Sequence, residues 1–297
     1  MPGEGEVVVR VRAASLNTAD LDQLQGRPPI ARVSTGLFAP KSRVLGLDIA
    51  GEVDAIGPGV TRFQPGDGVW GDMFSNGSGA FAEYVSGPET AFEPKPAGIS
   101  WEQAAAVPHS GLLALQALHA KGSIASGNQV VINGGGGCVG PFAIQIAKTM
   151  GAVVTAIDHS GKLDLMRSAG ADAVIDYTET DFTRAGMRYD FILDIAANRS
   201  VFAYKRALRP DGAYVQIART VAGFISAALF GALMGARRVG VFNWEPNRSD
   251  VLASIGHLIE TGAVAPVIDR TYPLSEVPDA VRYLADGRAR GKLVVTI

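Results

Sequence analysis

The stretch of sequence that decides the fold is QVVINGGGGCVGPFAIQIAKTM, residues 129–150. Its first five residues form a short run rich in valine and isoleucine, which is typical of a buried β-strand. The residues from Phe142 to Met150 have the composition and length of a helix. A glycine-rich turn joins the two. The stretch therefore predicts a strand, a tight turn and a helix in direct succession.

The turn contains glycines in the pattern G-x-G-x-x-G, at Gly135, Gly137 and Gly140. Between a strand and a helix, this pattern indicates dinucleotide binding. The first glycine allows the tight turn, the second lets the backbone approach a pyrophosphate, and the third lets helix pack on strand. A tight turn without a ligand is the alternative. The residues predicted to hold the cofactor here are Gly135, Gly136, Gly137, Cys138, Val139 and Gly140.

An acidic residue, Asp158, ends the next predicted strand, 21 residues after Gly137. An acid at about this spacing binds the ribose hydroxyls of a dinucleotide, although an ordinary helix cap is the alternative. Asp158 favours NADH, whereas the nearby Lys162 could receive the 2′-phosphate of NADPH. A carboxylate about 4 Å from one phosphate charge costs about 4 kcal/mol at the effective dielectric of a protein surface. Since Lys162 could offset an electrostatic cost of that size, these residues leave open whether the cofactor is NADH or NADPH.

Strands and helices alternate beyond this stretch. Further strands are expected at 153–158, 173–176, 191–194 and 213–217, with a helix over 162–169. Buried strands separated by helices indicate a parallel sheet that is covered on both faces. The predicted fold class is therefore α/β, with a doubly wound, Rossmann-type parallel sheet.

The first part of the chain, to about residue 105, is instead β-rich. Val7 to Ala14 alternate apolar and polar residues for most of their length, which is strand periodicity. Glycines interrupt the apolar run at 49–57, as expected where a sheet bends or bulges. Ser100, with Gln103 three residues later, predicts a capping box at the start of the first helix after this region.

Composition excludes several classes of protein. The 297 residues include 27 Lys+Arg and 29 Asp+Glu, so nucleic acid is not an expected partner. One cysteine cannot build a Cys-rich zinc lobe. The N-terminus is acidic and polar, unlike a signal peptide, so a cytoplasmic protein is expected. The uncharged segment 220–236 is shorter than the roughly 20 residues of a membrane span. It predicts a buried or interface helix, with membrane contact as the alternative.

Several spaced motifs, in order along almost the entire chain, accompany the glycine turn. They are Ala14-Ser15-Leu16-Asn17, Leu45-Gly46-Leu47-Asp48-Ile49-Ala50-Gly51, Gly66-Asp67-Gly68-Val69, Ala104-Ala105-Ala106-Val107-Pro108, Gly170-Ala171-Asp172-Ala173-Val174-Ile175-Asp176-Tyr177 and Ala289-Arg290-Gly291-Lys292. With them the chain resembles the medium-chain dehydrogenase/reductase superfamily, in its zinc-independent, quinone-oxidoreductase-like branch.

The resemblance implies a two-domain enzyme with its active site in the cleft between the domains. A β-rich, GroES-like catalytic domain would span 1–107 and be completed by 265–297, and a Rossmann NAD(P)-binding domain would span 108–264. Lys162 and Tyr177 fall where the branch holds the adenosine phosphate of NADPH, which favours NADPH while NADH stays possible. A homodimer through the edge strand near 238–242 is also implied.

Metal-dependent members of the superfamily have Gly-His-Glu where this chain has Gly46-Leu47-Asp48. Leucine cannot bind zinc, so no zinc is expected. Without a metal to activate an alcohol, the expected reaction is hydride transfer from the nicotinamide to a quinone or an α,β-unsaturated carbonyl. A protein that binds NADPH without turnover, as a redox sensor or interaction partner, is the alternative.

Two residues are the candidates for catalysis. The resemblance places Asn17 at the nicotinamide end of the cleft, where its amide could orient the carboxamide or the acceptor carbonyl. His109 could donate a proton to a quinone oxygen. Purely structural roles are the alternatives for both, as for Asp48, and Cys138 is either a reactive thiol or a small filler. The first hairpin usual in the family is absent before Val7, which indicates a truncated gene model or an altered cleft edge.

Overall fold

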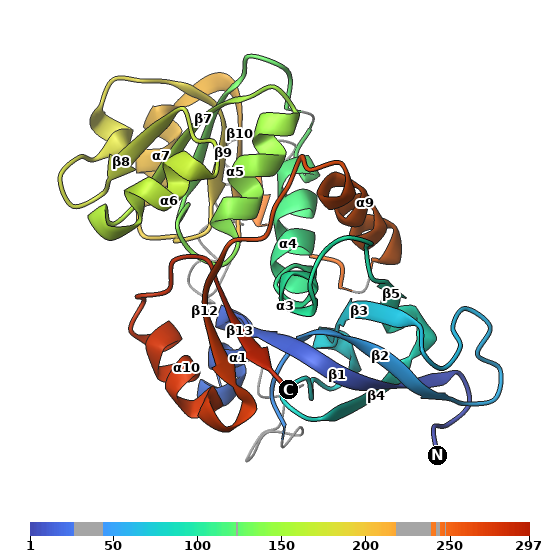
Figure 1. Cartoon of the computed structure of the whole chain (residues 1–297). Coiled ribbons are helices and arrows are strands. Elements are labelled where there is room, and N and C mark those ends of the chain that lie inside the picture. The colour runs from blue at the N-terminus through green and yellow to red at the C-terminus, as the bar shows by residue number, and fades with distance from the viewer. Residues whose placement is uncertain (27–43, 123, 218–238, 242–243, 247) are drawn as a thin grey trace. The chain divides into compact units, whose positions relative to one another are not determined.

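Figure 1 shows the computed structural model of the protein, which describes residues 1–26, 44–122, 124–217, 239–241, 244–246 and 248–297. The chain divides into two compact units: unit 1 comprises Met1–Leu112 with Glu245–Ile297, and unit 2 comprises Leu113–Trp244. The segment 220–236 lies outside the described residues, and so do Arg238 and Phe242 at the two ends of the predicted dimer edge. The domain boundaries drawn from the sequence stay a prediction.

Unit 2 contains the predicted parallel sheet. Its strands are β6 (Gln129–Asn133), β7 (Val153–Asp158), β8 (Ala173–Asp176), β9 (Tyr189–Asp194), β10 (Leu208–Gln216) and β11 (Val239–Val241). Their spatial order is β11-β10-β9-β6-β7-β8, and all neighbours are parallel. The chain runs outward from β6 to β8 and then returns to β9 on the other side of β6. Ligands bind at the carboxyl ends of strands at such a reversal.

Helices pack on this sheet as the alternating pattern predicts. They are α5 (Gly140–Thr149), α6 (Leu163–Ser168) and α7 (Val201–Ala207), with the short 3-10 helices η4 (Ser160–Lys162) and η5 (Phe182–Arg184). In Figure 1, α5 and α6 lie over β6, β7 and β8. On the opposite face Phe182 and Tyr204 pack with the sheet residues Val131, Ile192 and Tyr214. The doubly wound α/β class is therefore confirmed.

Unit 1 is built on a second, mixed sheet. Its strands are β1 (Glu6–Leu16), β2 (Asp48–Ile56), β3 (Gly68–Asp72), β4 (Tyr84–Pro88), β5 (Phe92–Pro94), β12 (Ile268–Pro273) and β13 (Lys292–Thr296). The order is β12-β13-β1-β2-β3-β5, and β4 also pairs with β1. The β1–β2 register shifts twice, and a Cβ on Gly51 of β2 would lie 2.2 Å from Arg10 O. This glycine is therefore required by a close approach of two strands.

The helices of unit 1 sit around this sheet. They are α1 (Thr18–Gln25), α3 (Trp101–Ala105), the start of α4 (Pro108–His119), α9 (Ser249–Glu260) and α10 (Val277–Ala285), with the 3-10 helices η2 (Phe74–Asn76), η3 (Glu89–Ala91) and η6 (Leu274–Glu276). The predicted capping box at the start of α3 is confirmed. Gln103 N donates to Ser100 Oγ at 3.2 Å, and Ser100 N donates to Gln103 Oε1 at 2.9 Å.

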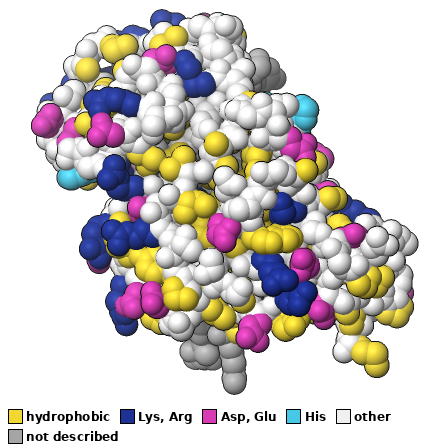
Figure 2. Space-filling view, viewed as in Figure 1, with side chains coloured by type: hydrophobic (Ala, Val, Ile, Leu, Met, Phe, Trp, Pro, Cys, Tyr) yellow, Lys and Arg dark blue, Asp and Glu magenta, His cyan; other side chains and the backbone are white. Residues whose placement is uncertain are grey.

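The surface mixes charges of both signs. Figure 2 shows Lys and Arg side chains next to Asp and Glu on the visible face. Exposed or half-exposed ion pairs of the protein include Arg12–Glu52 and Lys148–Asp172. Among the described residues, no helix is long and apolar enough to cross a bilayer.

Candidate functional site

The glycine turn of unit 2 is a compact loop bound to the neighbouring strand. Gly134 N and Gly135 N both donate to Ile157 O, at 2.8 and 3.0 Å. Gly134 has a φ of +94°, a conformation that side chains disfavour. A Cβ on Gly140 would lie 2.3 Å from the carbonyl C and O of Gly135, so the start of α5 touches the start of the loop. A Cβ on Gly135, the first glycine of the motif, would lie 2.7 Å from Met166 Sδ, so the first and third glycines of the motif both have a structural reason.

Gly137 is different, because the space beside its Cα is open. The nearest atom among the described residues to a Cβ placed there would be Gly134 O, at 3.8 Å. Val139, at the N-cap of α5, makes no side-chain cap, and Pro141 stands in the first turn. The unpaired N–H groups of such a helix start attract phosphate. The loop therefore fits a dinucleotide pyrophosphate, and the open space at Gly137 is where the backbone would meet it.

Gly137→Ala should weaken dinucleotide binding without destabilising the protein. The added methyl meets no described protein atom closer than 3.8 Å, yet it fills the space that the pyrophosphate would occupy. We expect the Kd for NADPH, from nicotinamide fluorescence, to rise about tenfold or more, which is about 1.4 kcal/mol. The melting temperature serves as the control and should stay close to that of the wild type. An unchanged Kd in a well-folded variant would contradict this assignment of the loop.

The residues predicted for the adenosine end lie together beside this loop. Asp158 Oδ2 accepts from Gly136 N at 2.9 Å, and Asp158 Oδ1 accepts from His159 N at 2.8 Å. Lys162 Nζ lies 3.8 Å from Asp158 Oδ1, and a Cβ on Gly136 would touch the Lys162 side chain. Tyr177 is half-exposed, and its N–H donates to Asp158 O at 3.2 Å. Asp158 thus stabilises the loop through its bond to Gly136 N. His159 Nδ1 accepts from Gly161 N and so caps the 3-10 helix η4.

A polar network under the loop was missed by sequence reasoning. Asp194 Oδ1 accepts from Asn133 Nδ2 at 2.8 Å and from Ala197 N at 2.9 Å, and Asp194 Oδ2 accepts from Tyr214 Oη at 2.7 Å. Burial raises the pKa of Asp194, although these hydrogen bonds oppose the shift. Asn133 and Asp194 end neighbouring strands in register, so polar residues at aligned strand ends are the signal that could have found this network.

Unit 1 contains a second group of buried polar side chains, centred on Lys292 of β13. Lys292 is 0% exposed, and its Nζ donates to Asn17 Oδ1 at 2.6 Å, Asp48 Oδ2 at 2.9 Å and Ser110 Oγ at 3.2 Å. All three ammonium hydrogens therefore have an acceptor. We call Lys292, Asp48, Asn17 and Ser110 the Lys292 cluster. The cluster joins the C-terminal strand to Asn17 just before α1, Asp48 of β2 and Ser110 of α4.

Asp48 connects this cluster to both predicted catalytic residues. Its Oδ2 accepts from Ser15 Oγ at 2.8 Å and from Asn17 Nδ2 at 2.9 Å, in addition to Lys292. Its Oδ1 accepts from the backbone N–H of His109 at 2.7 Å. Asp48 is 0% exposed, so its charge is balanced by the buried ammonium of Lys292. Asn17 and His109, 92 positions apart in the chain, are thus held by one carboxylate.

His109 also pairs with a second buried carboxylate. Its Nδ1 lies 2.9 Å from Asp72 Oδ2, and its ring stacks on Phe74 with centroids 5.7 Å apart. Burial lowers the pKa of His109, but the charges of Asp72 and Asp48 and the hydrogen bond outweigh it, so the pKa is raised above 6.5. Protonated histidine is the form that a proton donor needs. Sequence reasoning missed Asp72, which lies 37 residues from His109.

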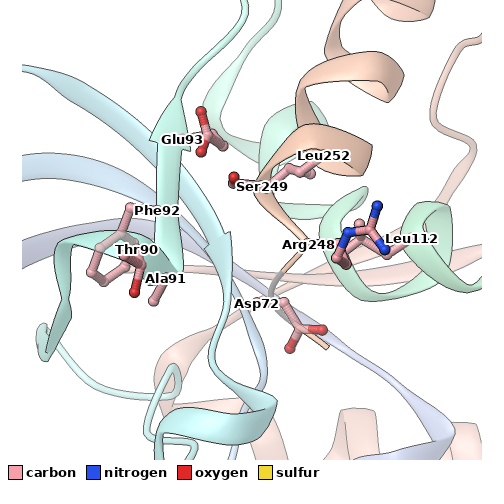
Figure 3. Close-up of a pocket in the computed structure, with 9 residues that line it drawn as sticks. All are labelled: Asp72, Thr90, Ala91, Phe92, Glu93, Leu112, Arg248, Ser249 and Leu252. Atoms are coloured by element: carbon pink, nitrogen blue, oxygen red, sulfur yellow. The ribbon is translucent and has the colours of Figure 1, made fainter. Parts of the chain in front are cut away.

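Asp72 also lines a small pocket of unit 1. Figure 3 shows it opposite Glu93 of β5, with Arg248 and Leu252 from the α9 side and Leu112 of α4 completing the wall. The Arg248 guanidinium is held by the carboxylates of Asp250 and Glu245. Its charge is therefore already balanced, and the pocket has no strong attraction for an anion.

Asp20, at the start of α1, carries a carboxyl group whose pKa is raised to about 7. Burial is the main cause, and the charge of Asp48 adds to it, against the hydrogen bond from Asn17 N. Between pH 4 and 7 the folded protein holds a proton here that the unfolded chain does not. Stability should therefore fall as the pH rises through this window, by about 1.4 kcal/mol per unit at most.

Asp20→Asn should remove this pH dependence. Denaturation midpoints at pH 5 and pH 7 give the free energy of unfolding of both proteins. Relative to the variant, the free energy of unfolding of the wild type should fall by about 2 kcal/mol from pH 5 to pH 7. Asp279→Asn, on the exposed side of α10, is the control and should leave the wild-type dependence in place. Parallel pH profiles for wild type and Asp20→Asn would contradict the raised pKa.

Two further residues bear on metal binding: the single cysteine, Cys138, and Leu47, which stands where metal-dependent relatives have a histidine. Cys138 is 9% exposed in the glycine loop, and Leu47 is buried beside Asp48 in unit 1. Within the described ranges, no three or more His, Cys, Asp or Glu side chains are grouped so that they could hold a metal ion.

Comparison with known proteins gives matches along nearly the whole chain. Residues 3–97 match the alcohol dehydrogenase GroES-like domain, and residues 169–295 match the zinc-binding dehydrogenase family. NAD(P)H oxidoreductase RTN4IP1, mitochondrial, of Mus musculus is 32% identical over 98% of this chain and 82% of the relative. The 2-methylene-furan-3-one reductase of Solanum lycopersicum is 32% identical over 98% and 72%. The quinone oxidoreductase from Coxiella burnetii has a TM-score of 0.88 at 29% identity, over 100% of this chain and 92% of that chain.

Proposed function

This chain belongs to the medium-chain dehydrogenase/reductase superfamily, in its quinone-oxidoreductase-like branch, and we propose that it reduces a quinone or an α,β-unsaturated carbonyl with NADPH. Within that branch an oxidoreductase role with a nicotinamide cofactor is established, and the acceptor and the choice of NADPH are our proposal. The observation that carries it is the glycine loop, closed at Gly140 and open at Gly137, with Lys162 beside it. The names of the tomato and Coxiella relatives, 2-methylene-furan-3-one reductase and quinone oxidoreductase, support the acceptor class.

We assign cofactor binding to residues of unit 2 and contacts with the reacting groups to residues of unit 1. In unit 2, the loop from Gly135 to Gly140 would hold the pyrophosphate, and Asp158, Lys162 and Tyr177 the adenosine end. The bound nicotinamide supplies the hydride. In unit 1, Asn17 would orient a carbonyl group, and the protonated His109 would supply a proton to a quinone oxygen. We propose 1–107 with 265–297 as the catalytic domain and 108–264 as the cofactor domain.

We also propose that the reaction needs no zinc. Where metal-dependent relatives have a histidine ligand, this chain has Leu47, which has no donor atom. The neighbouring Asp48 already accepts bonds from Lys292, Asn17, Ser15 and His109 N, so its lone pairs are in use. The hydride acceptor would be electrophilic by itself.

The direct test is an acceptor screen with the purified chain. Fluorescence titration gives the affinities for NADPH and NADH, and the loss of nicotinamide absorbance then follows turnover with a panel of quinones and enones. We expect turnover with at least one member, unchanged by a chelator. If the protein binds NADPH and oxidises it no faster with any acceptor, the catalytic proposal is lost. The alternative, an NADPH-binding redox sensor or interaction protein, would then stand.

Lys162→Ala should lower the preference for NADPH over NADH. The variant loses the cation beside the loop while Asp158 remains, so a 2′-phosphate would meet an unbalanced carboxylate. We expect kcat/KM with NADPH to fall about tenfold or more, and kcat/KM with NADH to change by less than about threefold. Lys148→Ala, which removes an exposed lysine of α5 paired with Asp172, is the matched control. An equal loss with both cofactors would refute the role of Lys162.

The assembly and location of the protein are further proposals. We propose a homodimer formed through the edge of the parallel sheet, where β11 is the last described strand. Sedimentation at micromolar concentration tests this, and a monomer would refute it. We also propose a cytoplasmic location, which fractionation of cells expressing the native gene would test.

A further inference from the structure

The amide of Asn17 is held in one orientation by the Lys292 cluster. Its Oδ1 accepts from Lys292 Nζ at 2.6 Å and from Ser110 Oγ at 3.1 Å, and its Nδ2 donates to Asp48 Oδ2 at 2.9 Å. An ammonium group can donate but not accept, and a carboxylate can accept but not donate. A flipped amide would set donor against donor at Lys292 and acceptor against acceptor at Asp48. The two buried charges therefore determine the orientation.

This orientation decides what Asn17 can offer to a ligand. The two lone pairs of Oδ1 are occupied by Lys292 and Ser110. Nδ2 has two hydrogens, and the described residues take one of them, at Asp48. What remains for a ligand is an N–H donor and not a carbonyl oxygen. The group that it recognises must be an acceptor, and a carbonyl oxygen is one.

We infer that Lys292 and Asp48 are positioning residues that fix the Asn17 amide so that its second Nδ2–H donates to a carbonyl oxygen of the bound ligand. This inference rests on the proposed function, which supplies such an oxygen on the acceptor and another on the nicotinamide carboxamide. Asn17 is then the catalytic residue, and Lys292, although fully buried, acts through it. The role explains why a lysine and an aspartate, costly to bury, occupy the interior of unit 1.

The donor has a defined task in the reduction of an enone. Hydride from the reduced nicotinamide adds to the β-carbon, the electrons of the C=C bond move toward the carbonyl, and negative charge develops on the oxygen. Solvent then protonates the α-carbon, leaving a saturated ketone and the oxidised cofactor. A hydrogen-bond donor aimed at the oxygen that gains charge stabilises this transition state more than the ground state.

The test exchanges the two side chains at constant charge. Asn17→Asp/Asp48→Asn keeps one carboxylate beside Lys292 and one amide beside that carboxylate, but position 17 then has oxygen where the N–H donor was. We expect kcat for trans-4-phenyl-3-buten-2-one to fall about 10²-fold with a melting temperature close to that of the wild type. Ser110→Ala is the matched control, because it removes one bond to Oδ1 and leaves the N–H and both charges. Ser110→Ala should lower kcat by less than about fivefold.

A spectroscopic measurement separates positioning from a merely structural role. With NADP⁺ present, isotope-edited infrared spectra of the ¹³C-carbonyl enone give the frequency of the bound carbonyl. The donor should lower this frequency in the wild type and in Ser110→Ala, and the exchange variant should lose the shift. If the exchange variant does not fold, Asn17→Ala, which retains the Lys292–Asp48 pair, is measured in its place with the same expectation.

A second arm distinguishes the two carbonyl sources. If the donor serves the carboxamide, the exchange variant loses affinity for NADP⁺ but not for its thionicotinamide analogue, and the enone frequency is unchanged. Either result supports the inference. A folded exchange variant that has the wild-type rate, carbonyl frequency and cofactor affinity would overturn the inference. The proposed function would then remain intact. A wild type that reduces no acceptor overturns the proposed function, and the inference with it.

Discussion

Lys292→Met should lower the free energy of unfolding by about 3–5 kcal/mol, the largest loss that we expect from any single change in unit 1. Methionine fills nearly the same volume but carries no charge. Asp48, which is 0% exposed, would lose the ammonium 2.9 Å away and stay buried. A buried charge without its partner costs far more than the pair contributes, because the remaining ion is still desolvated.

Chemical denaturation followed by tryptophan fluorescence measures this loss, since Trp70 and Trp101 both lie in unit 1. Lys148→Met is the matched control: Lys148 pairs with Asp172 at 2.7 Å, but its side chain is 34% exposed. An exposed pair of this kind contributes about 1 kcal/mol or less. Adding Asp48→Asn to Lys292→Met should recover much of the stability, because both charges then leave together. Equal losses from the two lysine variants would contradict the buried ion pair.

Gly140→Ala should disrupt the glycine loop and abolish cofactor binding at ordinary concentrations. The new Cβ would lie 2.3 Å from the carbonyl C and O of Gly135 and 2.6 Å from Gly134 O, all backbone atoms that cannot rotate away. Either α5 moves off the loop or the loop opens, and both displace the N–H groups that would meet the pyrophosphate. We expect a loss of about 3 kcal/mol in stability, the upper end for overpacking.

The comparison with Gly137→Ala makes this prediction specific. Both changes add one methyl to the same loop. At Gly137 the new Cβ would lie 3.8 Å from Gly134 O, whereas at Gly140 it would lie 2.3 Å from the Gly135 carbonyl. Thermal unfolding and NADPH titration of both variants should therefore give two patterns. Gly140→Ala loses stability and binding together, whereas Gly137→Ala loses binding alone. If Gly140→Ala melted like the wild type, the loop would not be packed as described.

The sheet of unit 2 was largely predictable because its signals are local. The strands predicted at 129–133, 153–158 and 173–176 have the same bounds in the structure. The capping box at Ser100 depends on a residue three positions away, so it too could be found. The start of α5 was placed two residues late, because Gly140 and Pro141 are weak helix formers that nevertheless suit a first turn.

The polar interior of unit 1 was not predictable in the same way. Asn17 and His109 were singled out, but nothing local in the sequence connects them to Lys292, Asp72 or each other. Asp48 stands where metal-dependent relatives have a glutamate, but the sequence does not reveal its partners. Lys292 lies in one of the spaced motifs, but its burial does not follow from the sequence, because an isolated lysine is far more often exposed.

The sequence by itself determined the doubly wound sheet, the glycine loop and the membership of the family, because periodicity, turn residues and motif spacing act over a few positions of the chain. Only the tertiary structure decided that Lys292 reaches Asn17, a residue 275 positions earlier. That contact exists because β13 pairs with β1, and the pairing places the lysine in the interior beside Asp48. Which hydrogens and lone pairs remain for a ligand follows from such distant partners, so the chemistry offered by Asn17 could not be read from the residues around it.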